Sequence, residues 1–283
     1  MFFFDLILYL HLPILFGLLW MYFSKISFEP ISTFELVGLT SGMAILLGGF
    51  GINVAHELGH RENRFEVLLA RLLLLPNLYM HFTEEHNLGH HKNVATPKDP
   101  STSRYGEMIY AFIPRSMFGV YIEAWQLENR RLKRAGLSIF HWKNKMIWFQ
   151  IIQGAYLLSV GLVFGWGIVP FAIIIGIGGI SLLESVNYIE HYGLRRKQLE
   201  SGRYEPVQPH HSWNSEHAAG RIFLFELTRH SDHHFKANRK YQILRHFEEA
   251  PQLPTGYPGS IILALFPPLW FSIMNKRVPQ PNH

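Results

Sequence analysis

The stretch IWFQIIQGAYLLSVGLVFGWGIVPFAIIIGIGGISLLESV, residues 147–186, decides the fold. A helix needs roughly 20 apolar residues to cross the hydrocarbon core of a membrane, so this run is too long for one span. The motif GWGIVP, Gly165–Pro170, interrupts it with two helix-breaking residue types. We therefore predict two membrane-spanning helices, at about 147–164 and 168–187, joined by a tight turn.

Two more apolar runs of membrane length lie nearer the N-terminus, at Phe2–Phe23 and Phe34–Ala55. A signal peptide is the alternative for the first run, but a basic leading region and a small-residue cleavage site are missing from it. Three shorter apolar stretches, at Phe65–Tyr79, Ile109–Trp125 and Ile261–Ile273, predict in-plane, re-entrant or short tilted helices. Four spans make two hairpins.

Composition agrees with a membrane protein built of helices. Hydrophobic residues make up 48% of the 283 residues, and aromatic residues 14%. There are no cysteines, which excludes disulfides, thiolate zinc sites, iron–sulfur clusters and haem-thiolate ligation. We predict an all-α, polytopic membrane helical bundle that forms a single integral-membrane domain over residues 1–283.

The basic residues are distributed very unevenly along the chain. The formal net charge is +5. Lys25 lies between the first two spans, and all other lysines and arginines fall within residues 61–145 and 195–277. The positive-inside rule then places both termini and both large loops in the cytoplasm. The basic surface is expected to face lipid headgroups and not nucleic acid.

Histidines gather in four clusters, which carry the chemistry. Residues three or four apart on a helix share a face, so we expect each cluster to present its imidazoles to one point. All four clusters lie on the predicted cytoplasmic side, at or just beyond a membrane boundary. The cluster residues are His56 and His60 in HELGH, His86, His90 and His91 in HNLGHH, His191 in EHYG, and His230, His233 and His234 in RHSDHH.

Nine imidazoles exceed what a single metal ion binds. Zinc is usually four-coordinate, whereas two six-coordinate ions with four or five histidines each would use all nine and keep positions open. Imidazole suits iron, zinc, copper and nickel, so the ligand set leaves the metal open. Open positions beside a membrane favour iron and dioxygen. A membrane metal carrier or sensor is the alternative from another functional class.

An acidic residue accompanies each cluster. Ligating histidines generally donate their second ring N–H to a carboxylate or carbonyl. We predict that Glu57, Glu85, Glu190 and Asp232 orient the histidines of neighbouring helices, with ordinary charge balance as the alternative. Glu184, inside the fourth span, must face a partner or a cavity.

Two further segments each have two possible interpretations. The segment PHHSWNSEH, with His210, His211 and His217, is interpreted as a polar loop that could instead line the site. The glycine-rich faces of Leu36–Phe50 and Ile173–Leu183 are either walls of a substrate path or helix-packing surfaces.

The segments HELGHR, EHNLGHHKNVATPKDP, NYIEHYGL and RHSDHHFKANRKYQILR resemble the successive signatures of the bacterial integral-membrane alkane monooxygenases. That family includes the hydroxylase component of xylene monooxygenase, and the resemblance covers about residues 48–245. It implies a non-haem site of two iron ions on the cytoplasmic side of the inner membrane, with all nine cluster histidines as ligands.

The resemblance also implies a reaction. The family uses O2 to hydroxylate the terminal methyl group of n-alkanes to 1-alkanols, with electrons from a separate rubredoxin and its reductase. The hydrocarbon substrate is expected to arrive from the lipid. Hydroxylation of methyl-aromatics, or hydroxylation or desaturation of another lipid-soluble chain, is the alternative. Assembly into a homo-oligomer stays open.

Overall fold

The computed structural model describes residues 2–279, which are helical with no strand beyond two isolated bridges. The chain forms two compact units, the first from residues 1–85 and 123–183 and the second from residues 86–122 and 184–283. It passes between them three times, at residues 85–86 and within the two helices α7 (Ile109–Arg134) and α9 (Val169–His191). The predicted all-α architecture is confirmed.

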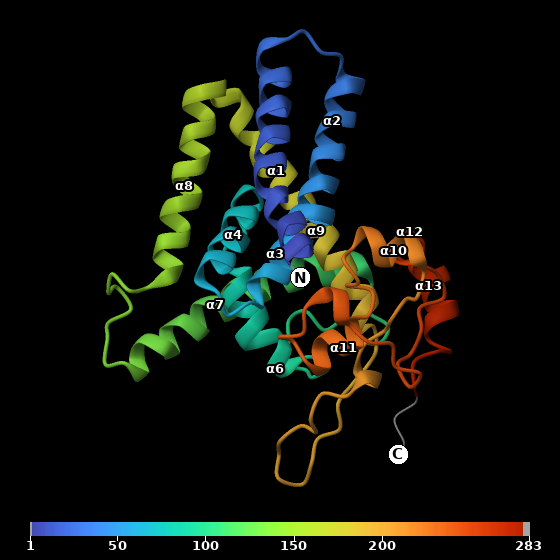
Figure 1. Cartoon of the computed structure of the whole chain (residues 1–283). Helices are drawn as coiled ribbons and strands as arrows, with labels where there is room; N and C mark the ends of the chain where they lie inside the picture. The colour runs from blue at the N-terminus through green and yellow to red at the C-terminus, as the bar shows by residue number, and fades with distance from the viewer. Residues whose placement is uncertain (1, 280–283) are drawn as a thin grey trace. The chain divides into compact units, whose positions relative to one another are not determined.

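The first unit begins with a helical hairpin of α1 (Phe2–Phe28) and α2 (Thr33–Leu46) (Figure 1). Ser32 starts α2 with a capping box, in which its hydroxyl accepts from the Glu35 backbone N–H while its own N–H donates to the Glu35 carboxylate at 2.9 Å. The π-helical segment η1 (Leu47–Ile52) and α3 (Asn53–Gly59) continue α2. The predicted second span is therefore present, with a π-helical segment that the hydropathy pattern did not predict.

The second hairpin of this unit contains the stretch that decided the fold. Helix α8 (Lys145–Phe164) ends at Gly165, whose φ of 97° lies in the region that favours glycine. The short η4 (Trp166–Ile168) then leads into α9. Two spans joined by a tight turn are confirmed, but α9 continues to His191, so this histidine ends the span and does not follow it.

The glycine-rich faces pack helix against helix. A Cβ on Gly48 would lie 2.7 Å from the carbonyl oxygen of Gly179, and a Cβ on Gly178 would lie 2.7 Å from the Ala44 side chain. Contacts this short leave no room for any side chain larger than hydrogen. The faces are thus packing surfaces at Gly48 and Gly178, whereas a Cβ on Gly38, Gly42 or Gly49 would meet nothing within 4 Å.

Smaller helices complete the first unit. Helix α4 begins at its N-cap Asn63, whose side chain accepts from the Phe65 N–H at 2.9 Å. Buried Glu84 binds Arg71 at 2.7 Å and Lys145 at 2.9 Å, which ties α5 to α4 and to the first residue of α8. The elements between α3 and the second unit are α4 (Arg64–Leu74), η2 (Leu75–Asn77) and α5 (Phe82–Glu85).

The second unit packs around the last turns of α9. Tyr188 and Tyr192 lie in its core with Phe112, Trp213 and Trp270. The Trp213 indole N–H donates to the Tyr192 carbonyl at 2.9 Å, and the Tyr188 hydroxyl donates to the Glu107 carbonyl at 2.6 Å. Its other elements are η3 (His86–His90), α6 (His91–Asn93), η5 (Pro209–His211), α10 (Ala218–Phe223), α11 (His230–Phe235), η6 (Tyr241–Ile243), α12 (Tyr257–Ala264) and α13 (Pro267–Met274).

Among the described residues, four helical stretches are long and apolar enough to cross a membrane, at Phe3–Phe28, Thr33–Gly59, Lys145–Phe164 and Trp166–His191. Many large apolar side chains on them are exposed, for example Met21 at 66% and Leu162 at 70%. Exposed apolar surface on helices of this length is expected where lipid is the solvent. The chain is a multi-pass membrane protein.

Candidate metal centre

Four histidines of the second unit converge through their Nε2 atoms. These atoms lie 3.2 Å apart between His90 and His234, 2.8 Å between His234 and His230, and 3.3 Å between His230 and His191. On one ion with metal–nitrogen bonds of about 2.1 Å, ligands at right angles stand about 3.0 Å apart. All four side chains are buried, so the group matches the donor set of one metal ion.

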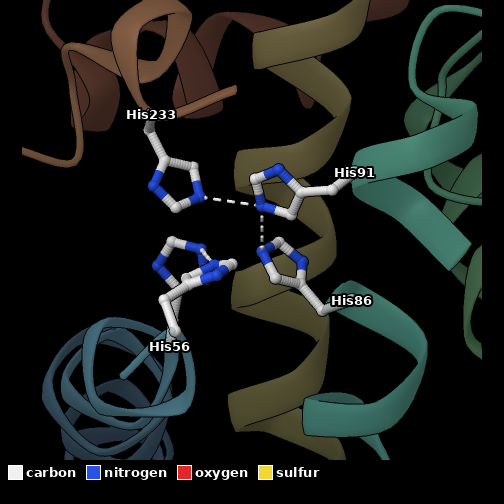
Figure 2. A group of neighbouring side chains, drawn as sticks. His56, His86, His91 and His233 are labelled. Carbon is white, nitrogen blue, oxygen red and sulfur yellow. Dashed lines mark hydrogen bonds between the residues drawn. The ribbon is translucent and has the colours of Figure 1, made fainter. Parts of the chain in front are cut away.

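A second group in the same unit contains His86, His91 and His233. The Nε2 atom of His91 lies 3.0 Å from the Nε2 of His86 and 3.0 Å from the Nε2 of His233. Figure 2 shows the three rings turned toward one another, with His86 and His91 from the consecutive η3 and α6 and His233 from α11. This spacing again fits ligands of one ion.

The two groups divide the sequence clusters, which we had expected to act as wholes. His86 and His90 are four apart, yet His86 joins His91 while His90 joins His191, His230 and His234. The cause is η3, a π-helical turn whose wider winding brings residues five apart onto one face. In the α-helical α11 the normal rule holds for His230 and His234.

The remaining two of the nine cluster histidines lie in the first unit. His56 and His60 lie at the end of α3 with Nε2 atoms 3.3 Å apart. They are one α-helical turn apart, so the predicted shared face is confirmed for this pair. His56 also packs its ring against Phe82, with centroids 6.2 Å apart.

The protonation state of His234 suits metal binding. Burial, followed by repulsion from His230 and other neighbouring histidines, holds the pKa of His234 well below its usual range. A neutral imidazole offers its lone pair to a metal, whereas a protonated one does not. Several neutral nitrogens aimed at one point cannot all find hydrogen-bond donors among themselves, so a bound cation would satisfy them. Both groups fit a metal ion.

Asp99 is a site residue that the sequence reasoning missed. Its Oδ2 accepts from the Nδ1 N–H of His90 at 2.9 Å, which leaves the His90 Nε2 for the metal. Thr102 Oγ1 and the Ser101 backbone N–H donate to the same carboxylate at 2.5 and 3.0 Å. Burial alone would raise the pKa of Asp99, but His90 and Thr102 outweigh it and lower that pKa. The local pattern Asp-Pro-Ser-Thr was the available signal.

The loop that we interpreted as merely polar holds α11 in place. Asn214 exchanges two hydrogen bonds with Ser231, from its Nδ2 to the hydroxyl at 2.7 Å and from the Ser231 N–H to its Oδ1 at 2.9 Å. The preceding Trp213 N–H donates to the Glu190 carbonyl at 2.8 Å. Because Ser231 follows ligand candidate His230 directly, the loop connects α11 to the end of α9.

The four predicted orienting acids have different surroundings. Glu190 is buried, with Oε2 3.2 Å from the Nε2 of His230 and Oε1 accepting from the Tyr257 hydroxyl at 2.6 Å. Asp232 accepts from the backbone N–H and the guanidinium of Arg245 at 2.7 and 3.0 Å. Glu57 binds Arg61 at 2.5 Å.

The fourth predicted orienting acid, Glu85, and the separate acid Glu184 are both buried. Glu85 is buried at the end of α5. Glu184 is buried within α9 and accepts from the Asn187 side chain at 3.2 Å. Glu184 therefore faces a polar partner inside the protein, as its cost in lipid required.

A third, smaller group of Glu205, His210 and His211 offers three donor atoms. However, His211 Nδ1 already accepts from the Gln208 N–H at 2.9 Å, and its Nε2 lies 3.2 Å from Glu205. Both ring nitrogens are thus used in holding the loop. Isolated His246 binds Glu216 at 2.9 Å on the surface.

Comparisons with known proteins match the chain over most of its length. The family model described as fatty acid desaturase matches residues 32–261. Alkane 1-monooxygenase 1 of Pseudomonas aeruginosa is 41% identical over 94% of this chain and 70% of its own length. The chain belongs to the fatty acid desaturase family, among the alkane 1-monooxygenases.

This chain covers a different share of the length of each of its other relatives. Alkane 1-monooxygenase 2 of Pseudomonas aeruginosa is 47% identical over 86% of this chain, and the chain spans 64% of that relative's length. A xylene/toluene monooxygenase hydroxylase component of Pseudomonas putida is 32% identical over 97% of this chain and 74% of its own length.

Proposed function

We propose that the protein is a membrane non-haem di-iron monooxygenase that hydroxylates the terminal methyl group of n-alkanes to 1-alkanols. The convergence of seven histidines, six of them buried and His91 half-buried, into two groups of Nε2 atoms carries the proposal. The names of the relatives supply the reaction, since proteins up to 47% identical to this chain are named alkane 1-monooxygenase. The proposed ligands are all imidazoles, which suit iron as well as zinc, copper and nickel.

Nine histidines would hold the two ions. We assign His90, His191, His230 and His234 to one ion. The other ion takes the remaining five, because the group of His86, His91 and His233 has fewer donors than a six-coordinate ion accepts and His56 and His60 form a matching pair of Nε2 donors. Asp99 orients His90 through its Nδ1, Glu190 lies beside the Nε2 of His230, and Asp232 and Glu57 bind the surrounding arginines.

Iron, when bound, would supply the oxidation of a C–H bond that no side chain can attack by acid–base chemistry. The protein's own contribution is to fix the ligands and exclude water. Asp99, fully buried with three hydrogen bonds, holds His90 in the tautomer with a free Nε2. The hydrocarbon would enter from the lipid, in which it partitions.

The electron donor and the membrane side belong to the same proposal. Lysines and arginines are concentrated in residues 61–145 and 195–277, which supports a metal centre on the cytoplasmic face of the bacterial inner membrane. The chain has no cysteine and therefore no rubredoxin-type iron site of its own. A separate rubredoxin, reduced by its reductase, would dock on the basic face if it is acidic.

Hydroxylation of methyl-aromatics is the second candidate reaction. It is favoured by the match to the xylene/toluene monooxygenase component, which extends over 97% of this chain. Desaturation is the third outcome to separate, because the matching family model is described as fatty acid desaturase.

Product analysis tests the proposal. Cells that express the protein with a rubredoxin and its reductase are fed a mixture of n-alkanes, a methyl-aromatic and a fatty acid, and the products are identified by mass spectrometry under ¹⁸O2. A 1-alkanol that carries ¹⁸O supports the proposal. A benzylic alcohol as the main product would favour the second reaction, and an alkene without ¹⁸O would overturn monooxygenation.

The same cells need a control that separates loss of the site from loss of the protein. His233→Ala changes a ligand candidate and should give no product, while His246→Ala changes a surface histidine that binds Glu216 and should give full product. If the unchanged protein and His246→Ala both yield no oxidised compound although iron is bound, the substrate belongs to another class.

A further inference from the structure

The helices α12 and α13 form a sharply bent pair near the C-terminal end of the described chain. Their axes bend by 119° at a break of a few residues, Leu265 and Phe266, before Pro267 and Pro268 start the second helix. Each helix has eight residues, or about 12 Å at 1.5 Å per residue. Neither helix can cross a hydrocarbon core of about 30 Å.

The outer surface of this pair is uncharged and mostly apolar, and the hydroxyl of its exposed Ser272 donates to the Leu269 carbonyl at 2.8 Å. No residue from Tyr257 to Met274 is charged. Its large exposed side chains are Ile262 at 60%, Leu265 at 40%, Phe266 at 60% and Leu269 at 50%. The polar Ser260 is buried and bonded to Thr255. A water-facing helix would place polar residues where these four lie.

The backbone at the bend is satisfied within the protein, which a lipid environment requires. The Tyr110 hydroxyl donates to the Leu265 carbonyl at 2.7 Å. The Phe266 N–H donates to the Leu263 carbonyl at 3.1 Å, and the Phe266 carbonyl accepts from the Leu269 N–H at 2.9 Å. The next two residues are prolines and have no N–H to satisfy.

Both arms are fixed to the end of the membrane span α9. Tyr257, at the start of α12, donates its hydroxyl to Glu190 at 2.6 Å. Trp270, in α13, packs its ring against Tyr188 and Tyr192 with centroids 5.5 and 5.3 Å apart. Because both helices contact the last turn of α9, both arms lie at the level where that span leaves the membrane.

Polar residues flank the pair on both sides. Before α12 lie Gln252 and Thr255, and after α13 lie Asn275, Lys276 and Arg277. The Tyr192 hydroxyl donates to the Asn275 side chain at 2.7 Å, so the exit from α13 is also tied to the end of α9. An uncharged segment with polar ends that return to one place is the pattern of a re-entrant loop.

We propose that α12–α13 is a re-entrant hairpin that enters one leaflet from the side on which α9 ends. Its exposed residues Ile262, Leu265, Phe266 and Leu269 contact lipid acyl chains, and both of its ends emerge on the same side. The occupant of this apolar surface is thus membrane lipid. The proposal concerns topology and does not depend on the proposed reaction.

Single cysteines test this directly, because the chain has none of its own. Thr255→Cys and Lys276→Cys report the two flanks, and both positions are exposed. Phe266→Cys and Leu269→Cys report the bend and the start of α13 at exposed positions, so the packing of the core is kept. Glu29→Cys, in the turn between α1 and α2, marks the opposite side. Sealed membrane vesicles of both orientations are treated with a membrane-impermeant maleimide.

We expect Cys at 255 and at 276 to be labelled from the same side, opposite to 29. The cysteines at 266 and 269 should stay unlabelled until detergent is added, and a bimane attached there should be quenched by lipids brominated in their acyl chains. Flanks labelled from opposite sides would mean that the pair spans the membrane. Labelling at 266 from water, or protection without quenching by brominated lipid, would mean that water or protein covers the hairpin. Each of these results overturns the proposal.

Discussion

His86 and His91 stand five residues apart in the chain, and their Nε2 atoms lie 3.0 Å apart. The π-helical turn η3 makes this pairing, because it places residues five apart on one face. His90, between them, is thereby turned to the other group and meets His234 at 3.2 Å. One extra residue in a helical turn lets a single short segment supply both groups.

Because the candidate ligands fall into two groups, we predict that each group can lose its metal separately. His233→Ala should remove the metal of its own group, whereas His230→Ala should remove that of the four-histidine group, because each side chain reaches one group only. Metal content per chain, measured on purified protein, should fall in both variants, and activity should vanish in both. His246→Ala should keep full metal content. Full metal content in His233→Ala would show that this residue is no ligand.

We predict that Asp99 is needed for tight metal binding although it is not itself a proposed ligand. Asp99→Asn removes the charge that holds His90 in one tautomer, and loss of such a partner typically weakens metal binding about 10–100-fold. A chelator competition titration measures this affinity. Ser101→Ala is the matched control, because Ser101 donates to Asp99 through its backbone N–H, which the substitution keeps. Equal affinities for the two variants would contradict the orienting role.

The membrane spans, the turn at Gly165 and the nine histidines follow from the sequence, because apolar run length and residue type are local properties. Asp99 does not, since it lies nine residues from His90 and only the loop around Thr102 brings it back. The acids predicted from the sequence stand next to the histidines of each cluster, and adjacent residues on a helix point in different directions. The loop at Trp213 and Asn214 was likewise missed, because its role depends on contacts with α9 and α11.

The π-helical turns η1 and η3 also could not be predicted from the hydropathy pattern. A helical period of 3.6 residues predicts that His86 and His90 act together, and this expectation is wrong. The glycine patterns, in contrast, predicted either close helix packing or a wall of a substrate path. The Gly48–Gly179 contact shows close packing at that position.

That glycine contact predicts a large difference between two substitutions in the same span. Gly48→Ala would place a Cβ 2.7 Å from the Gly179 carbonyl oxygen, and the overpacking should cost about 1–3 kcal/mol of stability. Gly38→Ala meets nothing within 4 Å and should be neutral or slightly stabilising. Thermal unfolding of the two variants in detergent measures the difference. Equal transition temperatures would mean that the two helices separate readily.

Tyr257 connects the hairpin to the metal centre. Tyr257→Phe leaves the Glu190 carboxylate buried without this donor, which should cost about 1–3 kcal/mol. Because Glu190 also contacts His230, metal affinity should fall with stability. Tyr105→Phe changes a half-exposed tyrosine and should alter neither. A loss of stability with unchanged metal affinity would limit Tyr257 to a packing role.

The pair of His211 and Glu205 predicts loosening of the 195–208 loop in acid. Burial, followed by the nearby His210, lowers the pKa of His211 from 6.5 to about 4, so between these values the unfolded segment binds more protons than the folded one. Stability of the loop therefore falls as pH drops through that window. The pKa of Glu205 is lowered from 4.5, chiefly by the Lys197 N–H, so its contribution is lost at lower pH still.

Hydrogen exchange of the Lys197 and Glu205 amides measures this loosening, since the first donates to the Glu205 carboxylate and the second to the Lys197 carbonyl. After correction for the intrinsic rate, their protection should decline from pH 6.5 towards pH 4. In His211→Gln the titrating ring is gone, so protection should be lower but nearly constant over the same range. A variant that keeps the full pH dependence would assign the effect to another group.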